Sequence, residues 1–132
     1  MTRLFFSLIA AVLVTSTALA DDIRTERVQF HKGANSATVH GTIKGRETVD
    51  YVLGARKGQS MNVSLSTDNG ANYFNIIEPG KADEAMFVGS TSGNQFEGTL
   101  PANGDYKVRV YLMRSAARRN EMAKYRLEMV ID

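Results

Sequence analysis

Apolar and polar side chains alternate along most of the chain after residue 20, with the period of two that is typical of β-strands. The alternation is clearest over residues 106–113 and 124–131. In the first segment the apolar side consists of Tyr106, Val108, Val110 and Leu112. In the second it consists of Tyr125, Leu127, Met129 and Ile131. One apolar and one polar face are what a sheet packed on one side requires, so both segments are predicted to border a core.

The same pattern, interrupted by glycine, asparagine and proline, predicts strands along the whole region. The candidates are residues 27–30, 37–43, 48–54, 60–66, 73–77, 85–89, 95–100, 106–113 and 124–131. Eight or nine short strands predict an all-β fold, an antiparallel two-sheet β-sandwich. Residues 114–122 are the exception, because their alanine, arginine and glutamate favour one or two helical turns in the last connection.

The first twenty residues have the three parts of a secretory signal peptide. A positive start at Arg3 precedes an apolar run over residues 4–14, and Ala18-Leu19-Ala20 forms a small-x-small cleavage site. The run is too short to cross a membrane as a helix. We therefore predict a signal peptide over residues 1–20 and a single β-sandwich domain over residues 21–132. No cysteine is present for lipid anchoring, so a soluble periplasmic protein is expected.

Charge is small in sum but uneven along the chain. The formal net charge is +2, and Arg3 in the predicted signal accounts for one unit, so the mature domain is close to neutral. Such a balance does not favour nucleic-acid binding. Seven cations lie within residues 107–126, namely Lys107, Arg109, Arg114, Arg118, Arg119, Lys124 and Arg126. Glu121 alone opposes them there, so the last hairpin is locally basic.

Residues suited to catalysis or metal binding are few and scattered. His31 and His40 have no neighbouring ligands in the sequence, and a metal site needs several. The acidic loop residues Asp68, Asp83 and Glu84 could serve glycoside hydrolysis or calcium binding. Solvated turn residues are the simpler interpretation of these carboxylates. We expect no enzymatic activity, no metal and no cofactor.

The connection after Tyr111 is unusual for a small sandwich. It takes about ten residues, and residues 114–121, the arginine segment, contain three arginines and neither glycine nor proline. In a helical turn Arg114 and Arg118 would repel each other, so Glu121 or an acidic partner should compensate. Arginine's planar fork suits it to binding carboxylates. The arginines either hold loop carboxylates of the sandwich or contact a partner.

The same region carries a resemblance to a known family. Residues 104–121, followed by Ala123-Lys124-Tyr125-Arg126-Leu127, resemble the C-terminal signature of the periplasmic inhibitors of g-type lysozyme. Earlier pieces match in order, among them Val28-Gln29-Phe30, Ile43-Lys44-Gly45 and Asn72-Tyr73-Phe74-Asn75-Ile76. The Gly58-Gln59 turn and the stretch from Leu100 to Tyr106 are also similar to pre-peptidase C-terminal domains. The resemblance covers nearly all of the predicted mature chain.

The resemblance implies a β-sandwich that occupies the substrate cleft of a g-type lysozyme with a basic loop. On the matching positions, the implied contact residues are Arg114, Arg118 and Arg119, with Ser115 and Tyr111 as neighbours. The alternative is a non-catalytic module that binds the cell envelope or a polysaccharide. Sugar stacking would need outward aromatic rings, for which Tyr51, Tyr73 and Tyr111 are the candidates.

Overall fold

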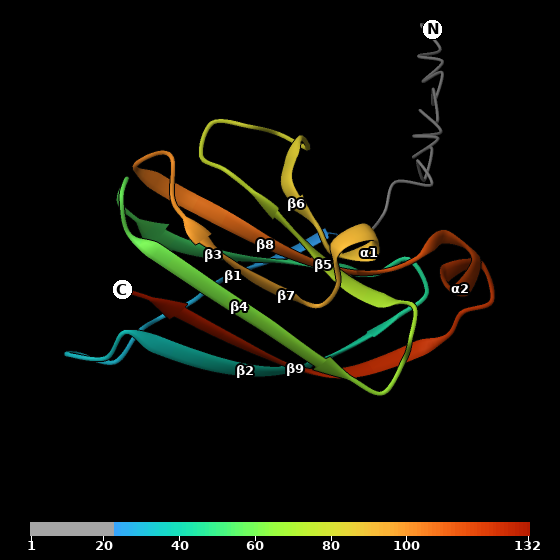
Figure 1. Ribbon diagram of the computed structural model, residues 1–132. Helices are drawn as coiled ribbons and strands as arrows, with labels where there is room; N and C mark the ends of the chain where they lie inside the picture. The colour runs from blue at the N-terminus through green and yellow to red at the C-terminus, as the bar shows by residue number, and fades with distance from the viewer. Residues whose placement is uncertain (1–22) are drawn as a thin grey trace, which may run out of the picture.

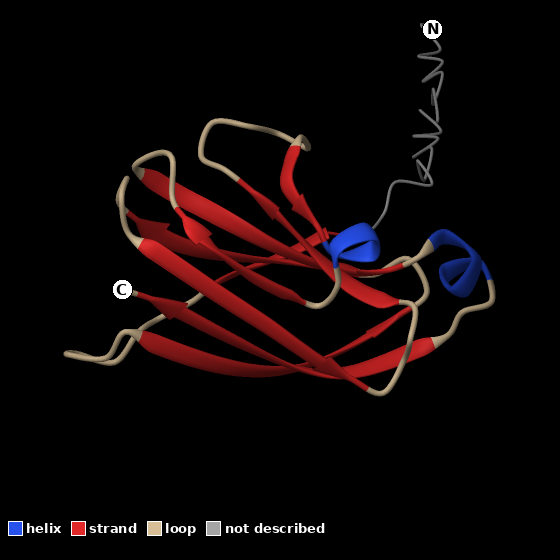
Figure 2. Cartoon of the chain, viewed as in Figure 1, coloured by secondary structure: helices blue, strands red, loops and turns tan. Residues whose placement is uncertain are grey.

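Two β-sheets packed face to face form the structure, a computed structural model that describes residues 23–132 (Figure 1). The five-stranded sheet has the order β1 (Ile23–Arg27), β3 (Thr48–Ala55), β8 (Gly104–Leu112), β5 (Asn72–Ile77) and β6 (Ala85–Val88). The four-stranded sheet has the order β2 (Ser36–Lys44), β9 (Met122–Ile131), β4 (Ser60–Thr67) and β7 (Gln95–Thr99). Two short helices, α1 (Gly89–Ser92) and α2 (Arg114–Arg118), lie in connections (Figure 2). The predicted all-β sandwich is confirmed. The predicted signal peptide lies outside the described residues.

The core lies between the sheets and is built by the alternation described above. On β8 and β9 every residue predicted to face inward is buried. Side chains of both sheets, such as Phe74 and Ile76 of β5 and Leu127 and Met129 of β9, belong to one core and are fully excluded from solvent. Each such side chain contributes about 1.5–3 kcal/mol by its burial, which is how a chain without cysteine holds this fold.

The first strand departs from the prediction. The expected strand over residues 27–30 is wrong, because β1 ends at Arg27 and the chain then leaves the sheet. β1 pairs with β3 in parallel, so the sandwich is not purely antiparallel. Every residue of β1 is exposed, so this edge strand lacks the apolar face that the alternation detects elsewhere. Only one backbone bond, from Val28 N to Val52 O at 2.9 Å, continues the pairing.

Helix α2 occupies one end of the sandwich, and the C-terminus lies at the opposite end (Figure 1). Two turns meet α2 there: residues 45–47 between β2 and β3, and residues 68–71 between β4 and β5. Backbone bonds join all three connections, from Gly45 N to Glu121 O at 2.9 Å and from Met113 N to Ala71 O at 2.9 Å. We call this region the α2 end.

Candidate functional site at the α2 end

The arginine segment folds as one helical turn that is fixed on the sandwich by two alanines. Ala116 and Ala117 are buried, and their small side chains let α2 lie directly over the end of the core. The turn ends at Asn120, whose φ of 54° is a left-handed conformation that asparagine tolerates better than most residues. The predicted helical turn is thus confirmed. With the alanines inward, Arg114, Arg118 and Arg119 are left exposed.

A groove of about 600 Å³ lies beside α2, between the β2–β3 turn and the outer face of the five-stranded sheet. Among its lining residues are three of the predicted contact residues, Tyr111, Arg114 and Arg118. Ser115 and Arg119 are exposed on the same turn but lie outside this lining. The structure therefore brings Tyr111, Arg114 and Arg118 together in one hollow, without Ser115 and Arg119. We call this hollow the α2 groove.

Three arginines of the α2 groove form no ion pair in the described part of the chain, and neither does Glu47, an acidic residue of the same lining. Within residues 23–132, Arg114 and Arg118 have no acidic partner, and the same holds for Arg46, which lines the groove from the β2–β3 turn. Of the two expected ways to compensate Arg118, Glu121 or an acidic partner, the structure does not show the first. Glu121 instead pairs with Arg119, with an N–O distance of 2.6 Å. Arg46 is not among the contact residues predicted from the sequence, because its place opposite α2 depends on the fold.

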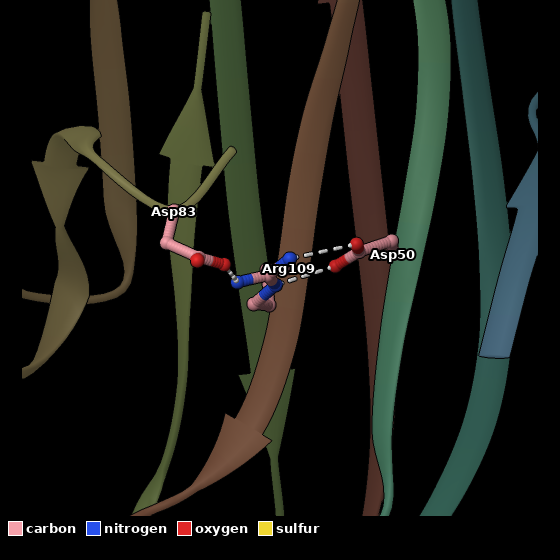
Figure 3. A network of polar contacts seen from close by, with 3 residues as sticks. All are labelled: Asp50, Asp83 and Arg109. Atoms are coloured by element: carbon pink, nitrogen blue, oxygen red, sulfur yellow. Dashed lines mark hydrogen bonds and ion pairs between the residues drawn. The ribbon is translucent and has the colours of Figure 1, made fainter. Parts of the chain in front are cut away.

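The floor of the α2 groove includes Arg109, whose charge is fully compensated. Figure 3 shows its guanidinium group between Asp50 on β3 and Asp83 on the β5–β6 loop. Asp50 accepts two bonds, at 2.7 Å from Nε and 3.0 Å from Nη2, while Asp83 accepts one at 3.1 Å from Nη1. The side chains of Asp50 and Arg109 are 5% and 17% exposed, whereas that of Asp83 is 83% exposed. These bonds, chiefly those to Asp50, raise the pKa of Arg109 above its ordinary value.

The Asp50–Arg109 pair follows from strand register, because the two residues lie directly opposite each other on β3 and β8. The sequence places Arg109 on the polar face of its strand but contains no local signal for its partner. A buried bidentate pair of this kind fixes the sheet face on which the α2 groove rests. Arg109 therefore helps to position the strands beneath the groove. The charge available to a partner comes from the arginines that have no ion pair among residues 23–132.

The aromatic candidates separate into two groups. The prediction of Tyr51 as a candidate outward ring for sugar stacking is wrong, because Tyr51 is only 1% exposed. Its hydroxyl group shares a 2.7 Å hydrogen bond with that of Tyr125, across the two sheets. Tyr73 and Tyr111 are half-buried on the outer face, and Tyr111 donates to Asn75 Oδ1 at 2.9 Å.

Large apolar side chains are exposed at this same end. In the part of the chain that the structure describes, the exposed large hydrophobic residues are Ile23 (48%), Met113 (42%) and Met122 (52%). Met113 directly precedes α2, and it lines the α2 groove together with Ile23. Met122 follows the arginine segment. Methionine and arginine are both enriched at the cores of protein interfaces, so this mixture is typical of a docking surface.

The described residues contain no group of three or more histidine, cysteine or acidic residues that could hold a metal ion. His31 and His40 are exposed, as expected. Asp68 accepts a backbone bond from Lys124 N at 2.8 Å, and Asp83 binds Arg109, so both act as structural loop carboxylates. No helix from residue 23 onward is long and apolar enough to cross a membrane.

Comparisons with known proteins identify the family. A scan against models of known protein families finds no match. The inhibitor of g-type lysozyme from Escherichia coli strain K12 is 35% identical over 121 residues, which cover 90% of this chain and 89% of that protein. The chain belongs to the family of g-type lysozyme inhibitors. The resemblance predicted from the sequence is confirmed.

Solved structures of such inhibitors match the fold. The periplasmic inhibitor of g-type lysozyme from Aeromonas hydrophila has a TM-score of 0.78 and 39% identity, over 86% of this chain and all (100%) of that one. The Salmonella Typhimurium protein of the same description has a TM-score of 0.66 and 33% identity, over 83% and 98%. The pre-peptidase C-terminal domain of a Bacillus anthracis collagenase, at 16% identity and a TM-score of 0.56, shares the fold alone, over 83% and 95%.

Proposed function

We propose that this chain is a periplasmic inhibitor of g-type lysozyme that binds the enzyme with its α2 end and catalyses no reaction itself. The relatives described as such inhibitors are similar over most of the chain. The α2 end is proposed as the binding surface because arginines without ion pairs in the described chain and exposed apolar side chains occur together there. We further propose that residues 1–20 direct export and that residues 21–132 form the mature domain.

The chemistry of the partner suits this surface. A glycosidase cleft holds catalytic carboxyl groups beside positions that bind sugar. Arg114 and Arg118 present guanidinium groups without acidic partners in the described chain, so binding a carboxylate there breaks no ion pair observed in the inhibitor. Arg119 differs, because a partner carboxylate would have to compete with Glu121 for it. Tyr111 and Ser115 are proposed as flanking contacts.

Mutation of the arginines separates these roles. The chain without residues 1–20 should inhibit the hydrolysis of peptidoglycan by a g-type lysozyme at near-stoichiometric amounts. Arg118→Ala and Arg114→Ala should each raise the inhibition constant about tenfold or more, since hot-spot arginines contribute over ~1 kcal/mol. Arg119→Ala should have a smaller effect, because its charge is already compensated.

Arg56→Ala is the matched control. Arg56 lies in the β3–β4 turn at the opposite end of the sandwich, next to residues paired with the C-terminus. Its removal should leave inhibition unchanged. Failure of the wild-type protein to inhibit at a large molar excess would overturn the proposal. Binding to peptidoglycan without any effect on lysozyme would instead favour the envelope-binding alternative.

A further inference from the structure

Besides the backbone bond from Met113 N to Ala71 O, the side chain of Asn69 links the β4–β5 turn to the arginine segment. Its Nδ2 atom donates to Glu121 Oε1 at 3.0 Å and to the backbone oxygen of Met122 at 3.2 Å. Its Oδ1 atom accepts from Ala71 N at 2.9 Å, so the turn itself fixes the orientation of the amide group. Both protons and the oxygen of the Asn69 amide are therefore engaged.

Glu121 passes this constraint to the arginine segment. Its second carboxylate oxygen accepts from Arg119 Nε at 2.7 Å, its backbone N–H donates to Ala116 O at 3.1 Å, and its carbonyl oxygen accepts from Gly45 N at 2.9 Å. The hydrogen bond from Asn69 and, after it, the bond from Arg119 lower the pKa of Glu121. The two carboxylate oxygens thus hold both neighbours at once, Asn69 on one oxygen and Arg119 on the other.

We propose that Asn69 is a positioning residue of the lysozyme-binding surface. It fixes Glu121, and through Glu121 it orders Arg119 and the C-terminal end of α2 before a partner arrives. The inference rests on the proposed function, because it assigns the ordered segment a binding role. A surface that is already ordered loses less conformational freedom on association, so its affinity is higher than that of a loose loop with the same side chains.

Two substitutions test the link between Asn69 and Glu121. Asn69→Asp keeps the acceptor for Ala71 N but removes both donors and places a second carboxylate beside Glu121. Combining it with Glu121→Gln reverses the bond, because the new glutamine amide can donate to the new carboxylate at position 69 while its oxygen accepts from Arg119. The double variant has the same net charge as the wild type. Recovery in the double variant shows that positions 69 and 121 act as a pair, and equal melting temperatures of the variants would show that the change in inhibition is not a general loss of stability.

Asn35→Asp is a closely matched control. Asn35 lies at the opposite end of the sandwich, and its Nδ2 atom likewise donates to a carboxylate, that of Asp132. The two single variants thus make the same substitution against the same kind of acceptor. Any general effect of an added carboxylate on stability should be shared between them and is read from their melting temperatures.

Two readouts are needed, inhibition of g-type lysozyme and trypsin cleavage of the free protein after Arg114, Arg118 and Arg119. Asn69→Asp should raise the inhibition constant severalfold, and by less than Arg118→Ala does, because it loosens Arg119 and the end of α2 without removing an arginine. It should also speed cleavage within the arginine segment. Addition of Glu121→Gln should restore most of the inhibition and most of the resistance to trypsin. Asn35→Asp should change neither the inhibition constant nor the rate of cleavage.

Equal effects of Asn69→Asp and Asn35→Asp, or no recovery in the double variant, would overturn the proposal. Unchanged cleavage and inhibition in Asn69→Asp would overturn it as well. If the wild-type protein fails to inhibit lysozyme, the proposed function fails and the affinity role of Asn69 fails with it. The cleavage experiment in the free protein would then still decide whether Asn69 orders the arginine segment.

Discussion

At the scale of single residues, the Tyr51–Tyr125 pair is the clearest test of how the two sheets are joined. The hydroxyl groups satisfy each other inside the core, with a separation of 2.7 Å. Tyr125→Phe leaves the Tyr51 hydroxyl buried without a partner and should cost about 1–3 kcal/mol in the free energy of unfolding. Tyr51→Phe/Tyr125→Phe removes both polar groups and should be nearly neutral. Urea unfolding of the wild type, both single variants and the double variant measures the coupling between the two hydroxyl groups. Changes in the free energy of unfolding that simply add would contradict this prediction.

The same pair should make the fold sensitive to alkali. Burial, more than any other cause, raises the pKa of Tyr51 and of Tyr125. A raised folded-state pKa means that the stabilisation is complete below the unfolded value, about 10, and declines as the pH rises above it. The unfolding free energy of the wild type should therefore fall above about pH 10, and that of the double phenylalanine variant should fall less.

Residue pairs that depend on register are also where prediction from the sequence stops. Alternation correctly placed Tyr106 and Leu127 in the core and Arg109 on the polar face. It could not pair Arg109 with Asp50, because these residues are 59 positions apart and meet only once β3 and β8 align. Tyr51 is a second example. A tyrosine is apolar in its ring and polar at its hydroxyl group, so the sequence alone does not decide whether it faces the core or the solvent.

At the scale of elements, α1 depends on one close approach of backbones. The strand predicted over residues 85–89 ends at Val88, because Gly89 begins α1 and packs on Phe74 of β5. A Cβ atom added at Gly89 would lie well inside contact distance of the Phe74 carbonyl oxygen and 3.1 Å from Phe74 N. Gly89→Ala should therefore destabilise the fold by about 1–3 kcal/mol.

Gly70→Ala is the comparison for that substitution. Nothing lies within 4 Å of a Cβ atom built at Gly70, and its backbone does not adopt the left-handed region. This change should leave the midpoint of urea unfolding unchanged or raise it slightly. Equal midpoints for the two variants would show that α1 can move away from β5 at no cost.

Element prediction succeeded where a strand has one buried face and failed where it has none. β8 and β9 alternate strictly because the core selects every second side chain. β1 consists of Ile-Arg-Thr-Glu-Arg, is exposed throughout, and forms only because β3 offers it an edge. The arginine segment could be singled out by its length and composition. The Asn69 turn that holds it could not, since Asn69 resembles any other turn residue in the sequence.

At the scale of the whole molecule, charge distribution is more informative than net charge. The predicted mature domain is close to neutral, yet Arg46, Arg114 and Arg118 gather at the α2 end without acidic partners among the described residues. A concentrated positive end steers an acidic cleft toward it during diffusion, and dissolved salt screens that attraction. Inhibition should therefore depend on ionic strength through the association rate more than through the dissociation rate.

Neutral substitution of two arginines tests this directly. The association rate constant with g-type lysozyme should fall severalfold as salt rises from about 0.05 to about 0.5 M, because the Debye length shortens from well over 10 Å to a few ångströms. Arg114→Gln/Arg118→Gln should lower the rate at low salt and flatten its salt dependence. Arg56→Gln/Lys57→Gln removes two cations at the opposite end and should retain the wild-type slope. Equal slopes for the two double variants would mean that net charge, and not the α2 end, governs the encounter.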